Sequence, residues 1–179
     1  VIGVNALDAA TTGVHSNIVI GDNAMGAATG ADLCTVVGSN AAGNGNMTSN
    51  ADGTVAIGRA ALASLTSGNG NTAVGYEALD ANTIGEGNTS LGYQSLSTNI
   101  DGDKNTGIGY RALFAHEPGT AGHGKNTAVG YEAGNDISTG TVNTLIGAEA
   151  GNTGTNDLSS GISNTLIGAD TAVSVNSAE

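Results

Sequence analysis

His116, Glu117 and His123 are the side chains best suited to binding a transition metal, because they are close together in the sequence. Imidazole nitrogens and carboxylate oxygens are common zinc ligands. The two histidines are further apart than the usual ligand spacings, however, and the glycines between them, Gly119 and Gly122, offer no preorganisation. We therefore predict a mobile surface loop here, without a metal or cofactor.

Asp101-Gly102-Asp103, followed by Asn105, places alternate side-chain oxygens as in part of a calcium loop. The distal bidentate glutamate of such loops is missing, along with most of the other ligands. The same pattern is common in solvated turns. We expect an acidic turn rather than a cation site.

The sequence gives no support to catalysis. A glycosidase needs two carboxylates at a defined separation, but the acidic residues here mostly occupy repeated positions or turns. No Ser-His-Asp order and no phosphate-binding loop stands out, and the single Cys34 excludes an internal disulfide or a thiolate metal cluster. We predict that the protein is not an enzyme.

The net charge of −12 limits the partners. Four basic residues cannot neutralise a row of phosphates, so we expect no nucleic-acid partner. No run approaches the roughly 20 apolar residues of a membrane span, and we expect no membrane insertion. The four basic residues are scattered along the chain: Arg59, Lys104, Arg111 and Lys125.

Positioning of all these residues depends on an internal repeat, which is the strongest signal in the sequence. One glycine recurs at spacings of 17 to 21 residues, always preceded by Ile, Val or Leu, and usually followed three positions later by Ala. An Asn-Thr pair opens six of the copies, at residues 71, 88, 105, 126, 143 and 164. The repeated glycines are Gly3, Gly21, Gly38, Gly58, Gly75, Gly92, Gly109, Gly130, Gly147 and Gly168.

A repeat of this length is too short to bury a face alone, so its copies must stack. Val, Ile, Leu and Phe together make up 35 of the 179 residues, too few for a wide globular core. We predict an all-β, parallel β-solenoid of about ten coils of 17–21 residues, with two short strands per coil. We expect it to be one repetitive segment over residues 1–179 and a fragment of a longer fibre.

Stacking places equivalent side chains in columns. We expect the aliphatic residue before each glycine to form the core column, and the asparagines to form an amide hydrogen-bond ladder. The longer coils place their additional residues in the turn before the next motif, at 43–52, 114–125 and 152–163. These turns are candidate binding loops.

The four tyrosines occupy one position in four consecutive motifs, as Tyr76, Tyr93, Tyr110 and Tyr131. They are candidate receptor contacts, because an aromatic strip is suited to stacking on sugar rings. The alternative is a structural ladder, in which each ring buries much of its surface while the hydroxyl stays hydrated.

Residues 71–79, with the sequence NTAVGYEAL, and their copies resemble the repeats of phage tail-fibre proteins. They also resemble, more loosely, the head repeats of YadA-like trimeric autotransporter adhesins, although the coils here are longer. The resemblance spans essentially the whole chain. It implies an extracellular homotrimer, on a virion tail fibre or a bacterial surface, that takes part in host attachment through a cell-surface glycan or protein receptor.

Two other functions remain open. A monomeric solenoid could bind ice or a mineral through a threonine ladder, although a flat binding face would favour regular outward pairs and each motif has a single threonine. The other hypothesis is a tailspike that degrades polysaccharide. The threonines in register are Thr72, Thr89, Thr106, Thr127, Thr144 and Thr165.

Overall fold

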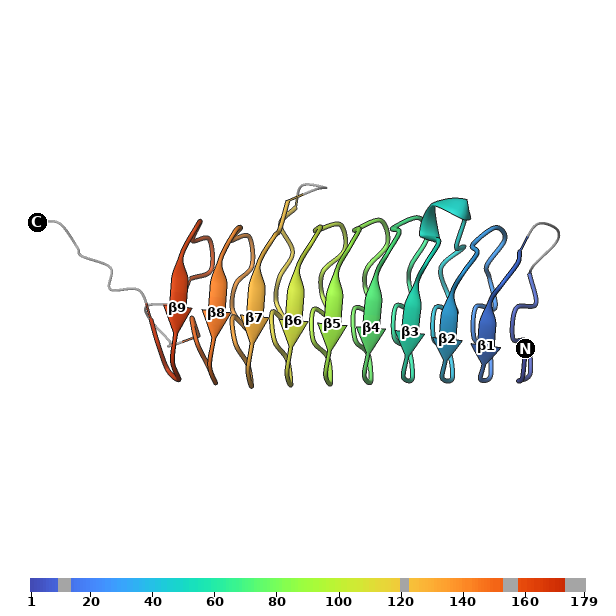
Figure 1. Cartoon of the computed structure of the whole chain (residues 1–179), viewed down its shortest axis with the longest axis horizontal. Coiled ribbons are helices and arrows are strands. Elements are labelled where there is room, and N and C mark those ends of the chain that lie inside the picture. The colour runs from blue at the N-terminus through green and yellow to red at the C-terminus, as the bar shows by residue number, and fades with distance from the viewer. Residues whose placement is uncertain (10–13, 120–122, 153–157, 173–179) are drawn as a thin grey trace, which may run out of the picture.

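The computed structural model describes residues 1–9, 14–119, 123–152 and 158–172. In this part of the chain nine strands form a single parallel sheet in sequence order, each strand pairing with the next without a register shift. Figure 1 shows the strands side by side along a rod. The strands are β1 (Ile18–Ile20), β2 (Thr35–Val37), β3 (Val55–Ile57), β4 (Thr72–Val74), β5 (Thr89–Leu91), β6 (Thr106–Ile108), β7 (Thr127–Val129), β8 (Thr144–Ile146) and β9 (Thr165–Ile167).

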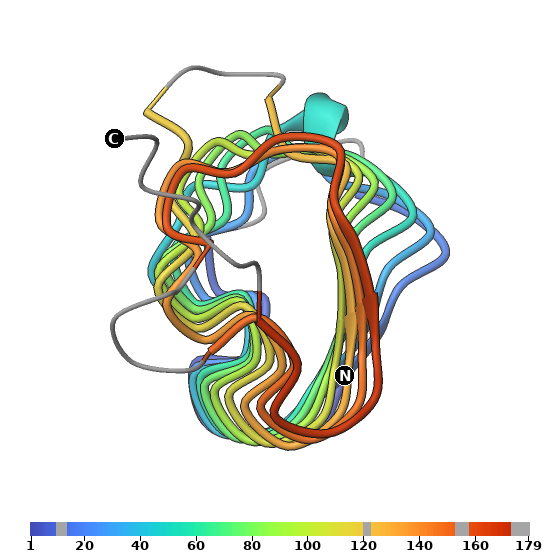
Figure 2. The same cartoon turned by 90° about the vertical axis from the view of Figure 1, so that its left-hand side faces the viewer.

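The predicted all-β parallel solenoid is therefore confirmed, but its coils contain less strand than expected. Each described coil has one three-residue strand rather than two strands, and the remainder is turn. The first motif contributes only an isolated bridge, between Ile2 and Ile20. Viewed end-on in Figure 2, the coils superimpose as a closed loop with the strands along one wall.

The coils of different length keep one register. The turn before β3 contains a short 3-10 helix, η1 (Ser49–Ala51), and β3 still pairs with β2 without a shift. The turns before β7 and β9 are also long, and these strands are in register with β6 and β8. Parts of those two turns, residues 120–122 and 153–157, lie outside the described residues.

The predicted core column was wrong, because the aliphatic residue before each glycine points outward. The middle residue of every strand is buried and its two neighbours are not, as in Thr72, Ala73 and Val74 of β4. A strand alternates its side chains between faces, so the inward position is the middle one. Its occupant varies among Val, Ala, Ser, Gly and Leu.

The interior is filled by the strand's middle residue and by the residues three and four places after the glycine, such as Ala78 and Leu79. Where one of these two positions, the middle strand residue or the residue four places after the glycine, holds a glycine, a larger side chain from the other fills the space. Gly107, the middle residue of β6, leaves room for Leu96, the fourth residue after the glycine in the preceding coil: an added Cβ on Gly107 would be 3.1 Å from the Leu96 Cγ. In the coil of β8 the strand supplies Leu145, and its side chain packs against Gly151.

The repeated glycine permits a close approach between coils that no other residue allows. Gly92 has φ +140°, in the region that side chains with a Cβ rarely adopt, and an added Cβ would lie 2.3 Å from the Gly109 carbonyl oxygen. The same contact recurs between Gly75 and Gly92, and between Gly109 and Gly130. The glycine column therefore sets the coil-to-coil distance at the corner after each strand.

A buried asparagine column runs along the opposite end of each strand, and the predicted amide ladder is confirmed. The backbone N–H of Asn88 donates to Asn71 Oδ1 at 2.9 Å, and its side-chain Nδ2 donates to the same oxygen at 3.2 Å. The pattern continues to Asn164, whose N–H donates to Asn143 Oδ1 at 2.9 Å. In the first three coils this position is held by Asn17, Cys34 and Thr54, an equivalence that the Asn-Thr motif did not reveal.

Replacing one glycine of the column tests its role in spacing the coils. We expect Gly92→Ala to lower the free energy of unfolding by about 3 kcal/mol or more, because backbone strain and a clash with a carbonyl oxygen are added together. Denaturant unfolding followed by circular dichroism measures the change.

Gly70→Asn is the matched control. Gly70 also has a positive φ, of +63°, but a Cβ there would meet nothing within 4 Å. Asparagine tolerates the left-handed region, so this variant should keep nearly full stability. Equal losses in the two variants would contradict the spacing role.

Candidate functional site

The outward residues of the nine strands form one continuous surface, which we call the sheet face. It has two columns, one at the first and one at the third strand position, and none of its eighteen residues is charged. Exposed members include Ile18, Leu91 and Ile167, at 56%, 47% and 68% of their full accessibility. In a chain of net charge −12, a neutral and half-aliphatic face of this length is unusual, since soluble monomers rarely expose large apolar patches.

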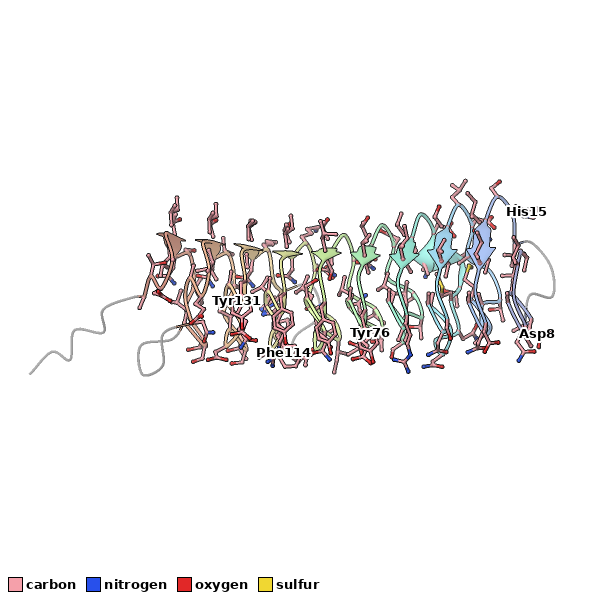
Figure 3. The ribbon with its side chains drawn as sticks, turned by 90° about the horizontal axis from the view of Figure 1, so that it is seen from below. Asp8, His15, Tyr76, Phe114 and Tyr131 are labelled. Atoms are coloured by element: carbon pink, nitrogen blue, oxygen red, sulfur yellow. The ribbon has the colours of Figure 1, made fainter. Side chains whose placement is uncertain are left out.

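The tyrosine column lies at the turn just beyond the sheet face, and Figure 3 looks onto this side. Successive rings of Tyr76, Tyr93, Tyr110 and Tyr131 are 5.1 to 5.3 Å apart between centroids and within 8° of parallel. The four rings are therefore a stacked ladder, and each is about half exposed. Stacking covers the ring faces and leaves mainly ring edges and hydroxyls toward solvent.

A column of mixed charge runs beside the tyrosines, two places after each glycine. Gln94 Nε2 donates to Glu77 Oε2 at 2.9 Å, and this hydrogen bond holds the pKa of Glu77 below its ordinary value. Arg111 lies 3.7 Å from Glu132. The guanidinium of Arg111 also lies over the ring of Phe114, 4.0 Å from its centroid, and Phe114 is half-buried.

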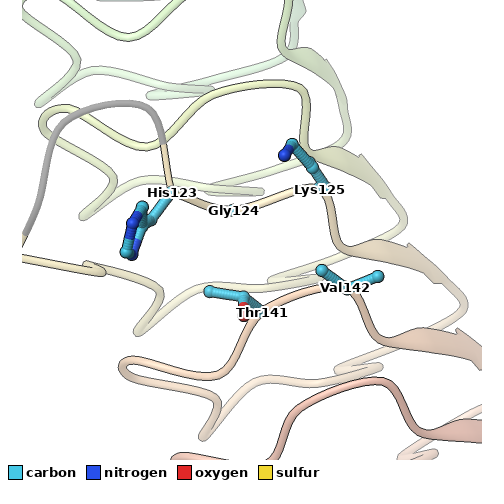
Figure 4. A pocket seen from close by; sticks show the side chains of 5 residues that line it. All are labelled: His123, Gly124, Lys125, Thr141 and Val142. Carbon is cyan, nitrogen blue, oxygen red and sulfur yellow. The ribbon is translucent and has the colours of Figure 1, made fainter.

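His116 and His123, which the sequence offered as possible zinc ligands, lie in different surroundings. His116 is fully buried inside the coil, so the expectation of a mobile surface loop was wrong for this residue. His123 lies on the surface, where it lines a shallow hollow with Gly124, Lys125, Thr141 and Val142 (Figure 4). Among the described residues, no group of three or more His, Cys, Asp or Glu side chains is placed to hold a metal ion.

The acidic turn that resembled a calcium loop is used for coil-to-coil hydrogen bonds. Asp103 Oδ1 accepts the backbone N–H of Glu86 at 2.8 Å, and the Gly102 carbonyl accepts the side-chain Nδ2 of Asn88 at 2.8 Å. The carboxylate of Asp32 accepts the N–H of His15 in the same way. These oxygens bind the preceding coil.

His116 occupies the position held by Asn82 and Asn99 in the two preceding coils. Asn99 Nδ2 donates to Asn82 Oδ1 at 3.3 Å, so a second, short amide ladder joins these two coils and stops before the imidazole, whose Nε2 lies 3.4 Å from Asn126 Nδ2. Burial lowers the pKa of His116 to about 4, and the negative charge of Asp101 opposes this shift only weakly. The buried atoms His116 Nδ1, Asn99 Oδ1 and Asp101 Oδ1 have no hydrogen-bond partner within the described residues.

Comparison with known proteins adds no relative: no family model, curated protein or solved structure matches the chain. No helix in the described ranges has the length and hydropathy of a membrane span. The surfaces above are therefore the basis for assigning a function.

His116 makes the stability depend on pH. The folded pKa, about 4, is below the ordinary value of 6.5, so the unfolded chain takes up the proton first and stability falls as the pH drops from 6.5 toward 4. One pKa unit corresponds to about 1.4 kcal/mol, so we expect a loss of about 2 kcal/mol between pH 6.5 and pH 5.

His116→Asn extends the amide ladder without a titrating group, and it should remove this loss. Thermal unfolding of both proteins across the same pH range measures the difference, with carboxylate effects common to both. Parallel curves for the two proteins would show that His116 does not carry the pH dependence.

Proposed function

We propose that the protein is a segment of an extracellular fibre that assembles into a homotrimer through the sheet face and holds receptor-binding loops at fixed positions. The observation that carries this proposal is the uncharged sheet face, a column of mostly threonine beside a column of aliphatic residues, running from β1 to β9. A face of this kind is stabilised when it is covered by another protein surface.

A second copy of the chain is the occupant best matched to the sheet face. Its two columns repeat at the coil spacing, so an identical face offers the same spacing along its whole length. Charges are kept off this face, which lets acidic chains approach without placing like charges opposite one another. Three faces meeting at one axis would bury all of them, as the resemblance to trimeric phage fibres and adhesins implies.

Adhesion is the function that this architecture serves best. The long turns at 43–52, 114–125 and 152–163 precede β3, β7 and β9, and these strands keep the register of their neighbours, so the turns can vary in length without shifting the strands. Three copies on a stiff rod raise apparent affinity for a repeated cell-surface glycan or protein through effective concentration. We place the protein on a phage tail fibre or a bacterial surface.

A charge on the sheet face tests the assembly. Leu91 is 47% exposed at the centre of the face, so Leu91→Asp should leave the coil intact while three buried carboxylates at the trimer axis prevent association. Light scattering coupled to size-exclusion chromatography is expected to give a trimer for the native chain and a monomer for the variant.

Ile84→Asp is the control, because Ile84 is exposed to a similar extent, at 44%, but lies in a turn outside the sheet face. It should remain a trimer. A monomeric native chain, or dissociation by both variants alike, would refute assembly through this face.

A second candidate function is binding of ice or a mineral by a monomer. The structure favours it in one respect, because threonine and the aliphatic residue two places later both point outward and form regular pairs, as in Thr144 and Ile146. The two members of a pair lie about 7 Å apart along the strand, and successive pairs lie about 4.8 Å apart across neighbouring strands. If this face binds ice, thermal hysteresis should appear in the native protein and disappear in Thr106→Leu; a native protein without hysteresis rules the candidate out.

A further inference from the structure

The two ends of the tyrosine column differ. At the first end Arg59 lies over the ring of Tyr76, 5.3 Å from its centroid, and donates to the tyrosine hydroxyl at 2.9 Å. At the other end, beyond Tyr131, the equivalent positions of the next two coils hold Ala148 and Ala169. The guanidinium of Arg59 therefore covers the outer face of Tyr76, whereas the residues beyond Tyr131 in the column have only methyl side chains.

Only Tyr131 has a ring face open for stacking. Tyr93 and Tyr110 each have a parallel ring on both sides, at 5.1 to 5.3 Å. The exposed fraction of Tyr131 is 50%, against 43% and 42% for the two inner rings. A planar ligand therefore cannot stack on the inner rings of the column. Of the four tyrosines predicted as receptor contacts, Tyr131 is the one that can stack on a sugar.

The open face of Tyr131 forms the wall of a step, which we define by Tyr131, Ala148 and Ala169. Both alanines are exposed. The step spans two coils, or about 10 Å at the ordinary strand separation, which is room for one or two sugar rings. The backbone N–H of Glu149 donates to the Tyr131 carbonyl at 2.8 Å, so wall and floor are held together by the coil-to-coil bonding.

Carboxylates border the step on one side. Glu132 follows Tyr131, and Glu149 follows Ala148, in the column beside the tyrosines. The charges of Glu132 and Glu149 both act on the Tyr131 hydroxyl, and the larger effect of Glu132 raises the pKa of Tyr131. Carboxylates accept hydrogen bonds from hydroxyl groups and repel anions. The border therefore suits a neutral, hydroxyl-rich ligand.

We propose that this step binds a pyranose ring of a neutral saccharide, with the C–H face of the sugar on Tyr131 and its hydroxyls donating to Glu132 and Glu149. The aromatic face carries partial negative charge and attracts polarised C–H groups, as in edge-to-face aromatic pairs. The inference deepens the proposed adhesive function, because it names one receptor contact and its chemical class. One weak site per chain becomes effective in a trimer through multivalency.

Binding of cellotriose and of triacetylchitotriose to the full chain tests the proposal. Tyrosine fluorescence is a direct reporter, because the chain contains four tyrosines and no tryptophan. Saturation-transfer NMR identifies the sugar protons that touch the protein. We expect at least one of the two sugars to bind through its ring C–H protons, and an oligogalacturonate of equal length to bind at least tenfold more weakly.

Ala148→Arg closes the step in the way that Arg59 closes the other end, and we expect it to weaken sugar binding at least tenfold. Ser39→Arg is the matched control, because it adds the same side chain to the same column before Arg59, far from Tyr131. It should leave binding unchanged. Arg59→Ala opens the face of Tyr76 beside Glu77, so it should add a second site and raise the sugar stoichiometry from one to two per chain.

Three results would overturn the proposal: no binding of either neutral sugar, tighter binding of the acidic sugar, or equal weakening by Ala148→Arg and Ser39→Arg. Molecular mass measured on the same samples separates this inference from the proposed assembly. If the chain is a trimer but binds no sugar, only the saccharide site is refuted. If it is a monomer that binds sugar at Tyr131, only the trimer assembly is refuted.

Discussion

The close approach of successive coils at the glycine column is the constraint on which the other features depend. Because the glycine carbonyl of one coil lies where the glycine of the preceding coil would carry a Cβ, every coil repeats at the separation of paired strands. Each side chain then lies beside the side chains at the equivalent positions of the two adjacent coils. Residue types that pair well with themselves are therefore favoured, and this accounts for the amide, aromatic and aliphatic columns.

The charged column shows how the same rule limits electrostatics. Like charges directly opposite one another on paired strands are destabilising, and the positions beside the tyrosines accordingly alternate in kind: Glu77, Gln94, Arg111 and Glu132. Glu149 breaks the alternation, and it does so where the tyrosines end. The buried columns avoid the problem by using asparagine, whose amide both donates and accepts and can therefore bond to a copy of itself. Amide ladders thus contribute order to an interior that has few aliphatic side chains.

The sequence was sufficient to predict the repeat, the parallel solenoid, the amide ladder and the stacking of the tyrosines, because each depends on identity at a fixed spacing. It was misleading about which face of the strand is buried. In Thr72-Ala73-Val74 the larger apolar residue is outside and the small one inside, since inner volume is shared with Leu79 and its equivalents. Hydrophobicity at one position cannot reveal that exchange. His116 was missed for a different reason: it lies at the start of a long turn, and only its offset of 17 residues from Asn99 marks it as part of a column.

Tolerance of long turns between rigidly spaced strands has an evolutionary consequence. A coil is a complete unit of about 17 residues that bonds to whatever coil precedes it, so duplication or deletion of one unit in the gene changes the length of the rod by about 4.8 Å and leaves its cross-section the same. Recombination between repeats that share this motif would generate such changes. The length of the rod and the chemistry of its surface can therefore be selected separately. The number of repeats sets the length, and the turns between strands set the surface chemistry.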